Sequence, residues 1–597
     1  MTYRAPVRDM AFSLHEVAGL RDLAGQGAFA DLTPDVIEAV LEEGARLAGD
    51  ILAPLNETAD REGARLEDGK VITAKGMAAA YRTWVDGGWG SLSATPDFGG
   101  QGLPVALSVA MQEMWNSACM AFGICPILSQ GAIEALTAHG TPELQAKYLP
   151  KLISGEWTGT MNLTESQAGS DLAALKSRAV PQGDGTYRIT GTKIFITYGE
   201  HDMVENIIHL VLARLPDAPA GTKGISLFLV PKFLVNDDGS LGERNDVMCI
   251  GLEEKLGIHA SPTCVMSYGE QGGAVGYLIG QENRGLACMF TMMNNARLLV
   301  GAQGVSVAER AYQLALAYAQ ERRQGRPLNS DLAPGEMAPI IEHPDVRRML
   351  LTMKGLTEAA RGICYATAVA IDRTHQGASV EDREASQARA DLLTPIAKAW
   401  STDIGVEVAS LGVQVHGGMG FIEEAGAAQY FRDARILPIY EGTNGIQAID
   451  LVTRKLPLGN GAVMRDYIAE MSKTASACEA SNDAALTEIG RELTAALACL
   501  TDATEWMLAR LPDEPDDCLA GATPYLKLFG TVAGGYCLAK GALAAVSALS
   551  GNDGNSFLSG KKALAHFYAL NLLPSVHGLT TPVKSGAAPL FAHDPAA

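Results

Sequence analysis

Disulfide and metal-binding cysteine motifs are missing from this sequence. Its ten cysteines are scattered from Cys119 to Cys537, with no CxxC motif and no Cys/His spacing that fits a zinc site. Cysteines distributed in this way are typical of buried, reduced thiols rather than of a disulfide framework. The sequence therefore predicts no metal site and a cytoplasmic location.

Long uncharged apolar runs are also missing. Charged residues interrupt the N-terminal MTYRAPVRDMAFSLHEV, which leaves no apolar core for a signal peptide. The most apolar long stretch, 525–549, contains Lys527 and Lys540 and is rich in Ala and Gly. Such a stretch is more typical of a buried helix than of a bilayer span, so we expect no membrane anchor.

Positive charge is scarce. The chain has 47 Lys and Arg against 68 Asp and Glu, a net charge of −21, and residues 512–517 read PDEPDD. This balance offers no broad basic surface for a nucleic acid, so we expect no nucleic-acid partner. Hydrophobic residues make up 47% of the 597 residues, which is typical of a packed globular protein with about four folding units.

The hydrophobic pattern changes three times along the chain. Helical spacing up to about residue 158 predicts an N-terminal helical domain, and short β-branched runs over 159–281 predict a middle β domain. Long helical periods over 282–456 predict a C-terminal helical bundle. A Gly and Pro break then precedes an additional helical tail domain, 462–597. The predicted class is α+β, because this order lacks the alternating βα units of a TIM barrel or a Rossmann fold.

Two glycine-rich strings superficially resemble nucleotide-binding loops. They are FGGQGLP at 98–104 and HGGMGF at 416–421. Neither follows a predicted strand and opens a helix within a βαβ unit, so neither by itself predicts a dinucleotide site. Taken alone, both are turns or helix caps.

Seven further strings occur in a fixed order between about residues 30 and 456. They are NLTESQAGSDL (162–172), GTKIFIT (191–197), EEKLGIHASPTC (253–264), NNARL (294–298), ERRQG (321–325), QVHGGMGF (414–421) and RDARILPIYEGTNGIQ (432–447). In sequence and spacing this set resembles the acyl-CoA dehydrogenase family. The resemblance implies FAD as cofactor, an acyl-CoA substrate, and a fold with N-terminal helices, a middle β domain and a C-terminal four-helix bundle.

The string LTESQAGSD is a polar, glycine-containing loop at the edge of the predicted β domain. Its hydroxyls and free backbone N–H groups suit a pyrophosphate or a flavin edge, although a solvated turn has the same composition. The resemblance assigns Leu163, Thr164 and Ser170 to FAD, and Ser170 also to the substrate. The loop departs from the usual TEPGAGSD at Ser166 and Gln167.

The string KIFIT is a predicted strand. Strict alternation would place Phe195 and Thr197 on one face and the two isoleucines on the other. Taken alone, both residues would be read as core. The resemblance places an aromatic residue over the flavin and a hydroxyl near flavin N5, so Phe195, where Trp is common, and Thr197 are predicted cofactor residues.

Four residues are predicted to bind the FAD of a neighbouring subunit. Arg322 ends a helical run and, taken alone, would be a solvated surface residue. In the family, the matching Arg binds the cofactor diphosphate, for which a guanidinium is well suited. The resemblance adds Gln414, Gly417 and Gly418 near the adenine end. If this holds, FAD binding requires an oligomer.

The reaction implied by the resemblance needs a carboxylate base for the α-proton of a thioester. The family places this base at the Glu of YEGT, which is Glu441 here, with Tyr440 and Gly442 as substrate neighbours and Thr443 and Asn444 as cofactor neighbours. A second branch carries its base at the position of Ala296, which has no carboxylate. Burial beside an apolar acyl chain is expected to raise the pKa of Glu441.

Arg297 follows that alternative position. Its role is open between structural pairing with Asn294, three residues away on the same helical face, and contact with the CoA portion of the substrate or with the active-site wall.

Three functions remain open. Over its whole length, including YRAPVRDM, the loop 325–349 and the tail, the chain is most similar to long bacterial members that oxidise 3-(methylthio)propionyl-CoA in dimethylsulfoniopropionate breakdown. A short or medium straight-chain acyl-CoA dehydrogenase of fatty-acid oxidation is the alternative, because a thioether sulfur resembles a methylene in size. Reduced flavin could instead react directly with oxygen.

From another class, some family members with a C-terminal helical domain bind DNA in alkylation repair. The acidic tail argues against that reading. The resemblance further implies electron-transfer flavoprotein as acceptor and a homodimer whose tail covers the surface that smaller members use to form tetramers.

Overall fold

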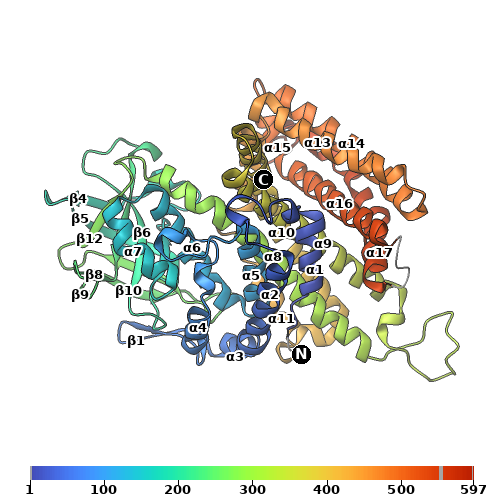
Figure 1. The fold of residues 1–597 in the computed structure, drawn as a ribbon, viewed down its shortest axis with the longest axis horizontal. Coiled ribbons are helices and arrows are strands. Elements are labelled where there is room, and N and C mark those ends of the chain that lie inside the picture. The colour runs from blue at the N-terminus through green and yellow to red at the C-terminus, as the bar shows by residue number, and fades with distance from the viewer. Residues whose placement is uncertain (1–2, 550–554, 595, 597) are drawn as a thin grey trace.

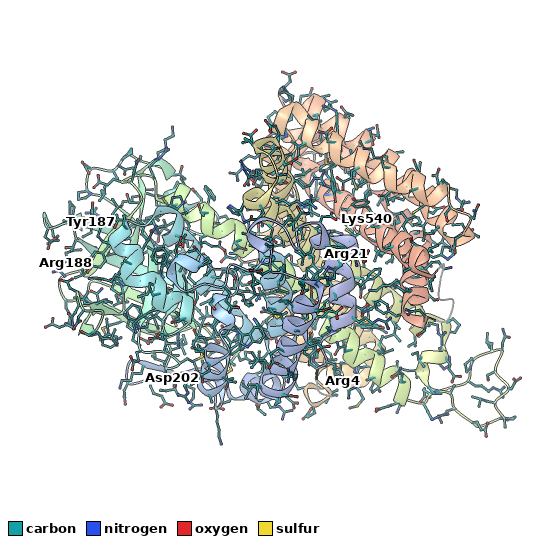
Figure 2. All side chains as sticks on the ribbon, viewed as in Figure 1. Arg4, Arg21, Tyr187, Arg188, Asp202 and Lys540 are labelled. Atoms are coloured by element: carbon teal, nitrogen blue, oxygen red, sulfur yellow. The ribbon has the colours of Figure 1, made fainter. Side chains whose placement is uncertain are left out.

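The computed structural model describes residues 3–549, 555–594 and 596. Figure 1 shows a β domain at one end, helices of the N-terminal region and a long-helix bundle in the centre, and a further group of helices at the opposite end. Figure 2 marks these ends with Tyr187 and Arg188 on the sheet and Lys540 on the last group. The predicted order of helical, β, helical and helical regions is confirmed.

Seven α-helices build the N-terminal region. They are α1 (Val7–Phe12), α2 (Pro34–Arg46), α3 (Leu55–Glu62), α4 (Met77–Asp86), α5 (Val105–Ala118), α6 (Met120–His139) and α7 (Pro142–Ser154). Local sequence sets the ends of α7: the Thr141 hydroxyl accepts the Leu144 N–H, Pro142 opens the helix, and Gly155 closes it at φ 85°. A short hairpin of β1 (Arg65–Glu67) and β2 (Lys70–Ile72) interrupts this region and was not predicted.

The β domain is an eight-stranded sheet with the order β10-β11-β5-β12-β7-β6-β3, and β4 beside β5 and β6. Its strands are β3 (Thr158–Asn162), β4 (Arg178–Pro181), β5 (Tyr187–Thr197), β6 (Ile207–Arg214), β7 (Ile225–Pro231), β10 (Val247–Leu252), β11 (Thr263–Tyr268) and β12 (Ala274–Ile279), with a separate hairpin of β8 (Phe233–Val235) and β9 (Leu241–Arg244). Strands β6 and β7 are buried on both faces, because Leu210 and Leu212 belong to the core with α6 and α7 while Val211 and Ala213 join a second core.

Three long helices form the bundle. They are α8 (Gly285–Glu321), α9 (Pro344–Gln376) and α10 (Val380–His416), completed by the short α11 (Ala427–Ala434) and α12 (Asn444–Asp450). Helices α8 and α10 approach closely, because a Cβ added at Gly301 would lie 2.3 Å from the Ala397 carbonyl oxygen and one at Gly304 would lie 2.3 Å from that of Ser401. This contact places residues 301–304 of α8 against residues 397–402 of α10.

The predicted break before the tail is a sharp reversal in which Gly459, Asn460 and Gly461 all have positive φ. In the described part of the tail, seven α-helices follow: α13 (Ala462–Glu479), α14 (Ala484–Arg510), α15 (Pro515–Ala520), α16 (Ala522–Leu549), α17 (Ser556–Asn571), α18 (Thr580–Lys584) and α19 (Ala588–Phe591). Helix α16 packs on the bundle, where a Cβ added at Gly530 would lie 2.3 Å from the Trp400 ring.

Buried ion pairs and a backbone contact tie the tail to the rest of the chain. Lys561 of α17 lies 2.5 Å from Asp9 and 2.9 Å from Glu358. Glu358 also pairs with the fully buried Arg361 at 3.0 Å. Lys540 donates to the Val17 carbonyl at 2.7 Å. Because these carboxylates and cations come from three regions of the chain, their burial makes the tail part of one folded body.

Among the residues that the structure describes, two helices, α6 and α16, are long and apolar enough to cross a membrane by length and composition alone. In the folded chain, 83% of the apolar window of α6 and 56% of that of α16 are buried.

All ten cysteines are unpaired, and nine of them are buried, as the sequence predicted.

Candidate active site

Glu441 lies in a tight turn between α11 and α12. Its φ is 55°, and that of Gly442 is 83°. A left-handed conformation costs a non-glycine residue about 1 kcal/mol or more, so the surrounding structure must hold it. The Asn444 N–H donates to the Pro438 carbonyl at 2.9 Å, and the Gln447 side chain donates to the Glu441 carbonyl at 3.4 Å.

A cavity of about 310 Å³ opens beside this turn. It brings together the loop that follows β3, the bulged end of β5, one face of α8, and Glu441. Its lining residues are Met161, Leu163, Thr164, Gly169, Ser170, Asp171, Leu172, Phe195, Ile196, Thr222, Leu286, Phe290, Met293, Arg297, Glu441, Gly442, Ile446 and Arg454. The cavity thus combines apolar side chains with a few converging polar groups, as small-molecule sites do.

Two carboxylates, Asp171 and Glu441, line the cavity. Asp171 is exposed and accepts the Ala173 N–H at 2.9 Å, so it caps a short helical turn. Burial raises the pKa of Glu441, as the sequence predicted, and the charges of Arg297 and Lys398 oppose that rise. Of the two, Glu441 has the environment of a general base.

Arg297 faces the same cavity from α8. Its side chain is 7% exposed, and its guanidinium lies 3.8 Å from Asp450, which also pairs with Arg454 at 2.5 Å. Burial lowers the pKa of Arg297, while the Asp450 and Glu441 charges raise it. An added Cβ at Gly442 would lie 3.8 Å from Arg297 Nη2. Arg297 therefore has both a structural ion pair and a position on the cavity wall.

The neighbouring Ala296 is buried and does not line the cavity. The alternative position for a base is thus apolar and faces the core.

A buried ion pair supports the loop that carries Thr164 and Ser170. Glu165 accepts hydrogen bonds from Lys193 Nζ at 2.9 Å and from the Ser177 hydroxyl at 2.7 Å, and Lys193 also donates to the Leu163 carbonyl at 2.9 Å. Burial would raise the pKa of Glu165, but Lys193 and these hydrogen bonds hold it at about 2. The unusual Gln167 joins this arrangement by donating to Glu165 at 2.6 Å.

The expected alternation of KIFIT is wrong at Phe195. Its φ is 60°, and the β5–β11 register shifts beside it, so the strand has a β-bulge there. The bulge leaves Phe195 59% exposed and places it with Ile196 on the cavity wall. Thr197 pairs with Thr263 at the strand end and does not line the cavity.

Arg322, Gln414, Gly417 and Gly418 are all exposed, and none lines the cavity. Their two segments meet because Tyr318 of α8 stacks on His416 of α10 with ring centroids 4.4 Å apart. An added Cβ at either glycine would meet nothing within 4 Å. These residues form a second, outward-facing patch.

The remaining predicted residues hold the turn together. The Thr443 hydroxyl caps α12 by accepting the Ile446 N–H at 3.2 Å. The Asn444 side chain is bonded to α10, and the Tyr440 hydroxyl is bonded to Gln303 of α8. None of the three lines the cavity.

The sequence reading missed four residues around the site: Glu165, Lys193, Lys398 and Arg454. Lys193 carried a signal, since a Lys at an inward position of a strand needs a buried partner. Lys398 carried a similar one, because it lies in the apolar run LLTPIAKAW of a helix.

Comparison with known proteins supplies the family. Residues 38–156, 160–268 and 283–456 match the N-terminal, middle and C-terminal domains of acyl-CoA dehydrogenases, and residues 467–594 match the acetyl-CoA dehydrogenase C-terminal-like domain. The 3-methylmercaptopropionyl-CoA dehydrogenase of Ruegeria pomeroyi is 48% identical over 96% of either chain. The chain belongs to the acyl-CoA dehydrogenase family.

A more distant full-length relative is the butyryl-CoA dehydrogenase of Syntrophomonas wolfei, 34% identical over 98% of this chain and 97% of its own. Among solved structures, an acyl-CoA dehydrogenase complexed with FAD from Bacillus anthracis has a TM-score of 0.74 at 20% identity, covering 98% of this chain and 95% of its own. This likeness includes the tail, so it extends to the whole fold.

Acyl-CoA dehydrogenases are FAD-dependent oxidoreductases that act on CH–CH groups, and this chain shares that cofactor and reaction class. The residues present fit a flavin. An exposed aromatic ring, two hydroxyls on a rigid loop and an apolar wall surround one cavity with Glu441, and the open glycine patch offers backbone without side-chain obstruction.

Proposed function

We propose that this acyl-CoA dehydrogenase removes the α-proton of a short acyl-CoA thioester with Glu441. The observation that carries the proposal is the position of this carboxylate, raised in pKa, in the cavity that also contains Thr164, Ser170 and Phe195. When bound, FAD supplies the acceptor for the β-hydrogen, which leaves as hydride. The polypeptide supplies the base and a water-poor cavity.

The chain's own residues divide the remaining tasks. The Glu165–Lys193 pair keeps the hydroxyls of the β3 loop in place, and the buried Arg297 keeps a positive charge beside the base. The backbone N–H of Glu441 is the proposed donor to the thioester oxygen. The left-handed turn fixes the direction in which that N–H points.

The proposed substrate is 3-(methylthio)propionyl-CoA, and the product is methylthioacryloyl-CoA. Support comes from the 48% identity to the Ruegeria enzyme. The second candidate is a short or medium straight-chain acyl-CoA, supported by the relative named for butyryl-CoA. The cavity wall of Met161, Leu286, Phe290 and Met293 suits either chain, so we expect discrimination of about 1–3 kcal/mol per group at most.

Steady-state turnover with an artificial electron acceptor tests this proposal. The kcat/KM values for 3-(methylthio)propionyl-, butyryl-, hexanoyl- and palmitoyl-CoA are compared. We expect the highest kcat/KM for 3-(methylthio)propionyl-CoA, and values for butyryl- and hexanoyl-CoA that are lower by no more than about 100-fold. A preference for palmitoyl-CoA would reject the short-chain assignment.

We propose a homodimer in which the outward patch binds the cofactor of the other subunit. Several large apolar side chains are exposed on the segment that follows the patch in the chain: Met419, Phe421, Ile422, Phe431 and Ile439. Apolar exposure of this kind is typical of an interface.

The natural electron acceptor is proposed to be electron-transfer flavoprotein. This is tested by anaerobic reduction of the enzyme, followed by addition of that protein or of air.

A further inference from the structure

Lys398 is among the most deeply buried cations of the chain. It lies in the middle of α10, and its side chain has no exposed surface. Its Nζ donates to Asn444 Oδ1 at 2.8 Å. A buried ammonium whose direct partner is a neutral amide is expensive to fold, since desolvation of the charge costs several kcal/mol. Such an arrangement is expected where the charge has a role in function.

The Asn444 carboxamide is completely engaged by α10. Its nitrogen lies 3.0 Å from the Ala399 carbonyl, 3.0 Å from the Thr402 hydroxyl and 2.7 Å from Asp403 Oδ1. Its oxygen accepts from Lys398 and, at 3.3 Å, from Thr402. Because all of its hydrogen-bonding capacity is used, Asn444 fixes the first turn of α12 to one turn of α10.

This attachment acts directly on the turn that carries Glu441. Asn444 is the third residue after Glu441, and its backbone N–H closes the turn on the Pro438 carbonyl at 2.9 Å. Glu441 and Gly442, which lie between Pro438 and Asn444 in the chain, both have positive φ. Loss of the α10 attachment would let the turn relax toward an unstrained conformation and move the carboxylate.

The charge of Lys398 also faces the base. Burial lowers the pKa of Lys398 to about 7. The negative charges of Glu441 and Asp403 oppose this change, and the positive charge of Arg297 adds to it. Burial raises the pKa of Glu441, and the charges of Arg297 and Lys398 both oppose that rise.

Other charges act on the neighbours of this group. Asp450 and Arg454 face Arg297, and Lys527 of α16 and Arg435 face Asp403.

We propose that Lys398 is a positioning residue of the active site, which holds the Glu441 turn through Asn444 and, on the acidic side of neutrality, keeps a positive charge beside the base. This inference rests on the proposed role of Glu441. It assigns two separable effects to one side chain, a hydrogen bond that sets geometry and a charge that sets the ionisation of the base.

Three variants separate the two effects. Lys398→Met removes the bond and the charge, Lys398→Gln keeps a donor for Asn444 but removes the charge, and Thr402→Val removes hydrogen bonds to Asn444 but leaves the charge. Each is purified as holoenzyme, its FAD content is measured, and kcat, KM and the pH dependence of kcat/KM are determined with butyryl-CoA and an artificial acceptor.

We expect the acidic limb of the pH profile to move up by about one pH unit in both Lys398 variants, because the base loses a nearby positive charge. In Thr402→Val the limb stays in place. We expect kcat to fall at least ~10-fold in Lys398→Met and by a smaller factor in Lys398→Gln. In both variants KM should change by a smaller factor than kcat.

An unchanged limb in both Lys398 variants would overturn the inference, as would failure of both to accumulate as FAD-containing enzyme, since the role would then be structural only. Glu441→Gln, measured in parallel, keeps the two proposals apart. If Glu441→Gln turns over normally, the proposed base is wrong; if it is inactive while the Lys398 variants resemble the parent, only the role of Lys398 fails.

Discussion

Lys193 Nζ lies 2.9 Å from Glu165 Oε1, and both side chains are almost completely buried beneath the loop that carries Thr164 and Ser170. The pair joins the middle of β5 to the loop that follows β3 and also fixes the Leu163 carbonyl. The cofactor loop is therefore held from below by an ion pair rather than by apolar packing alone.

Lys193→Met leaves the Glu165 carboxylate buried without its cation, so we expect the free energy of unfolding to fall by about 3–5 kcal/mol and the FAD content to fall with it. Urea unfolding and the flavin absorbance of the purified protein measure the two effects. In the double variant Lys193→Met with Glu165→Met, no charge is left buried, and much of the stability should return. Equal stability of Lys193→Met and the parent would contradict this role.

The left-handed conformation of Phe195 can be measured separately from its ring. Phe195→Ala and Phe195→Gly both remove the ring, but only glycine adopts φ near 60° without strain. We expect Phe195→Gly to be more stable than Phe195→Ala by about 1 kcal/mol in urea unfolding of the apoprotein, although both lose affinity for FAD. A more stable Ala variant would show that the bulge is not maintained in solution.

Phe421 tests the second patch. Phe421→Asp is expected to shift the dimer towards monomer and to cause loss of FAD on dilution, because the side chain is 87% exposed beside the glycine patch. Phe591→Asp is the matched control, since Phe591 is 82% exposed at the end of the tail. Sedimentation velocity measures both. A monomeric parent, or the same response in both variants, would reject the proposed interface.

The acidic limb of kcat/KM should lie above pH 4.5. Burial raises the pKa of Glu441 from that value in the folded protein, and the base works only when ionised, so activity is present above the raised pKa and is lost as pH falls through it. Glu134 is the control, because burial raises its pKa to about 8 but it does not line the cavity. Glu134→Gln should leave the limb in place. Movement of the limb in that variant would show that the limb reports the ionisation of Glu134 rather than that of Glu441.

The order of the regions was predictable because helical and strand periodicity are local properties of the sequence. The turn residues of the break at 457–461 and the polar loop after β3 were visible for the same reason. By contrast, the bulge at Phe195 depends on its register with β11, and the alternation of KIFIT gave no sign of it.

The partners of the buried charges could not be read from the sequence either. Lys193 and Glu165 are 28 residues apart, and Lys398 and Asn444 are 46 apart, on elements whose contact only the fold defines. Glu441 was assigned from its motif, whereas its ionisation is set by its burial and by the opposing charges of Arg297 and Lys398 from two other helices. The base could thus be identified from a local sequence motif, whereas the residues that control its ionisation come from distant parts of the sequence.

Reduction of the bound flavin by substrate in the absence of oxygen tests the central assignment most directly. Glu441→Gln and Asp171→Asn, the amides of the two cavity carboxylates, are mixed anaerobically with 3-(methylthio)propionyl-CoA and with butyryl-CoA, and the loss of yellow absorbance is followed by stopped flow. We expect Glu441→Gln to retain FAD but to bleach at least ~10²–10⁴-fold more slowly than the parent, and Asp171→Asn to bleach at nearly the parental rate. Bleaching of Glu441→Gln at the parental rate, or the opposite order of the two variants, would contradict the role of Glu441 as the base.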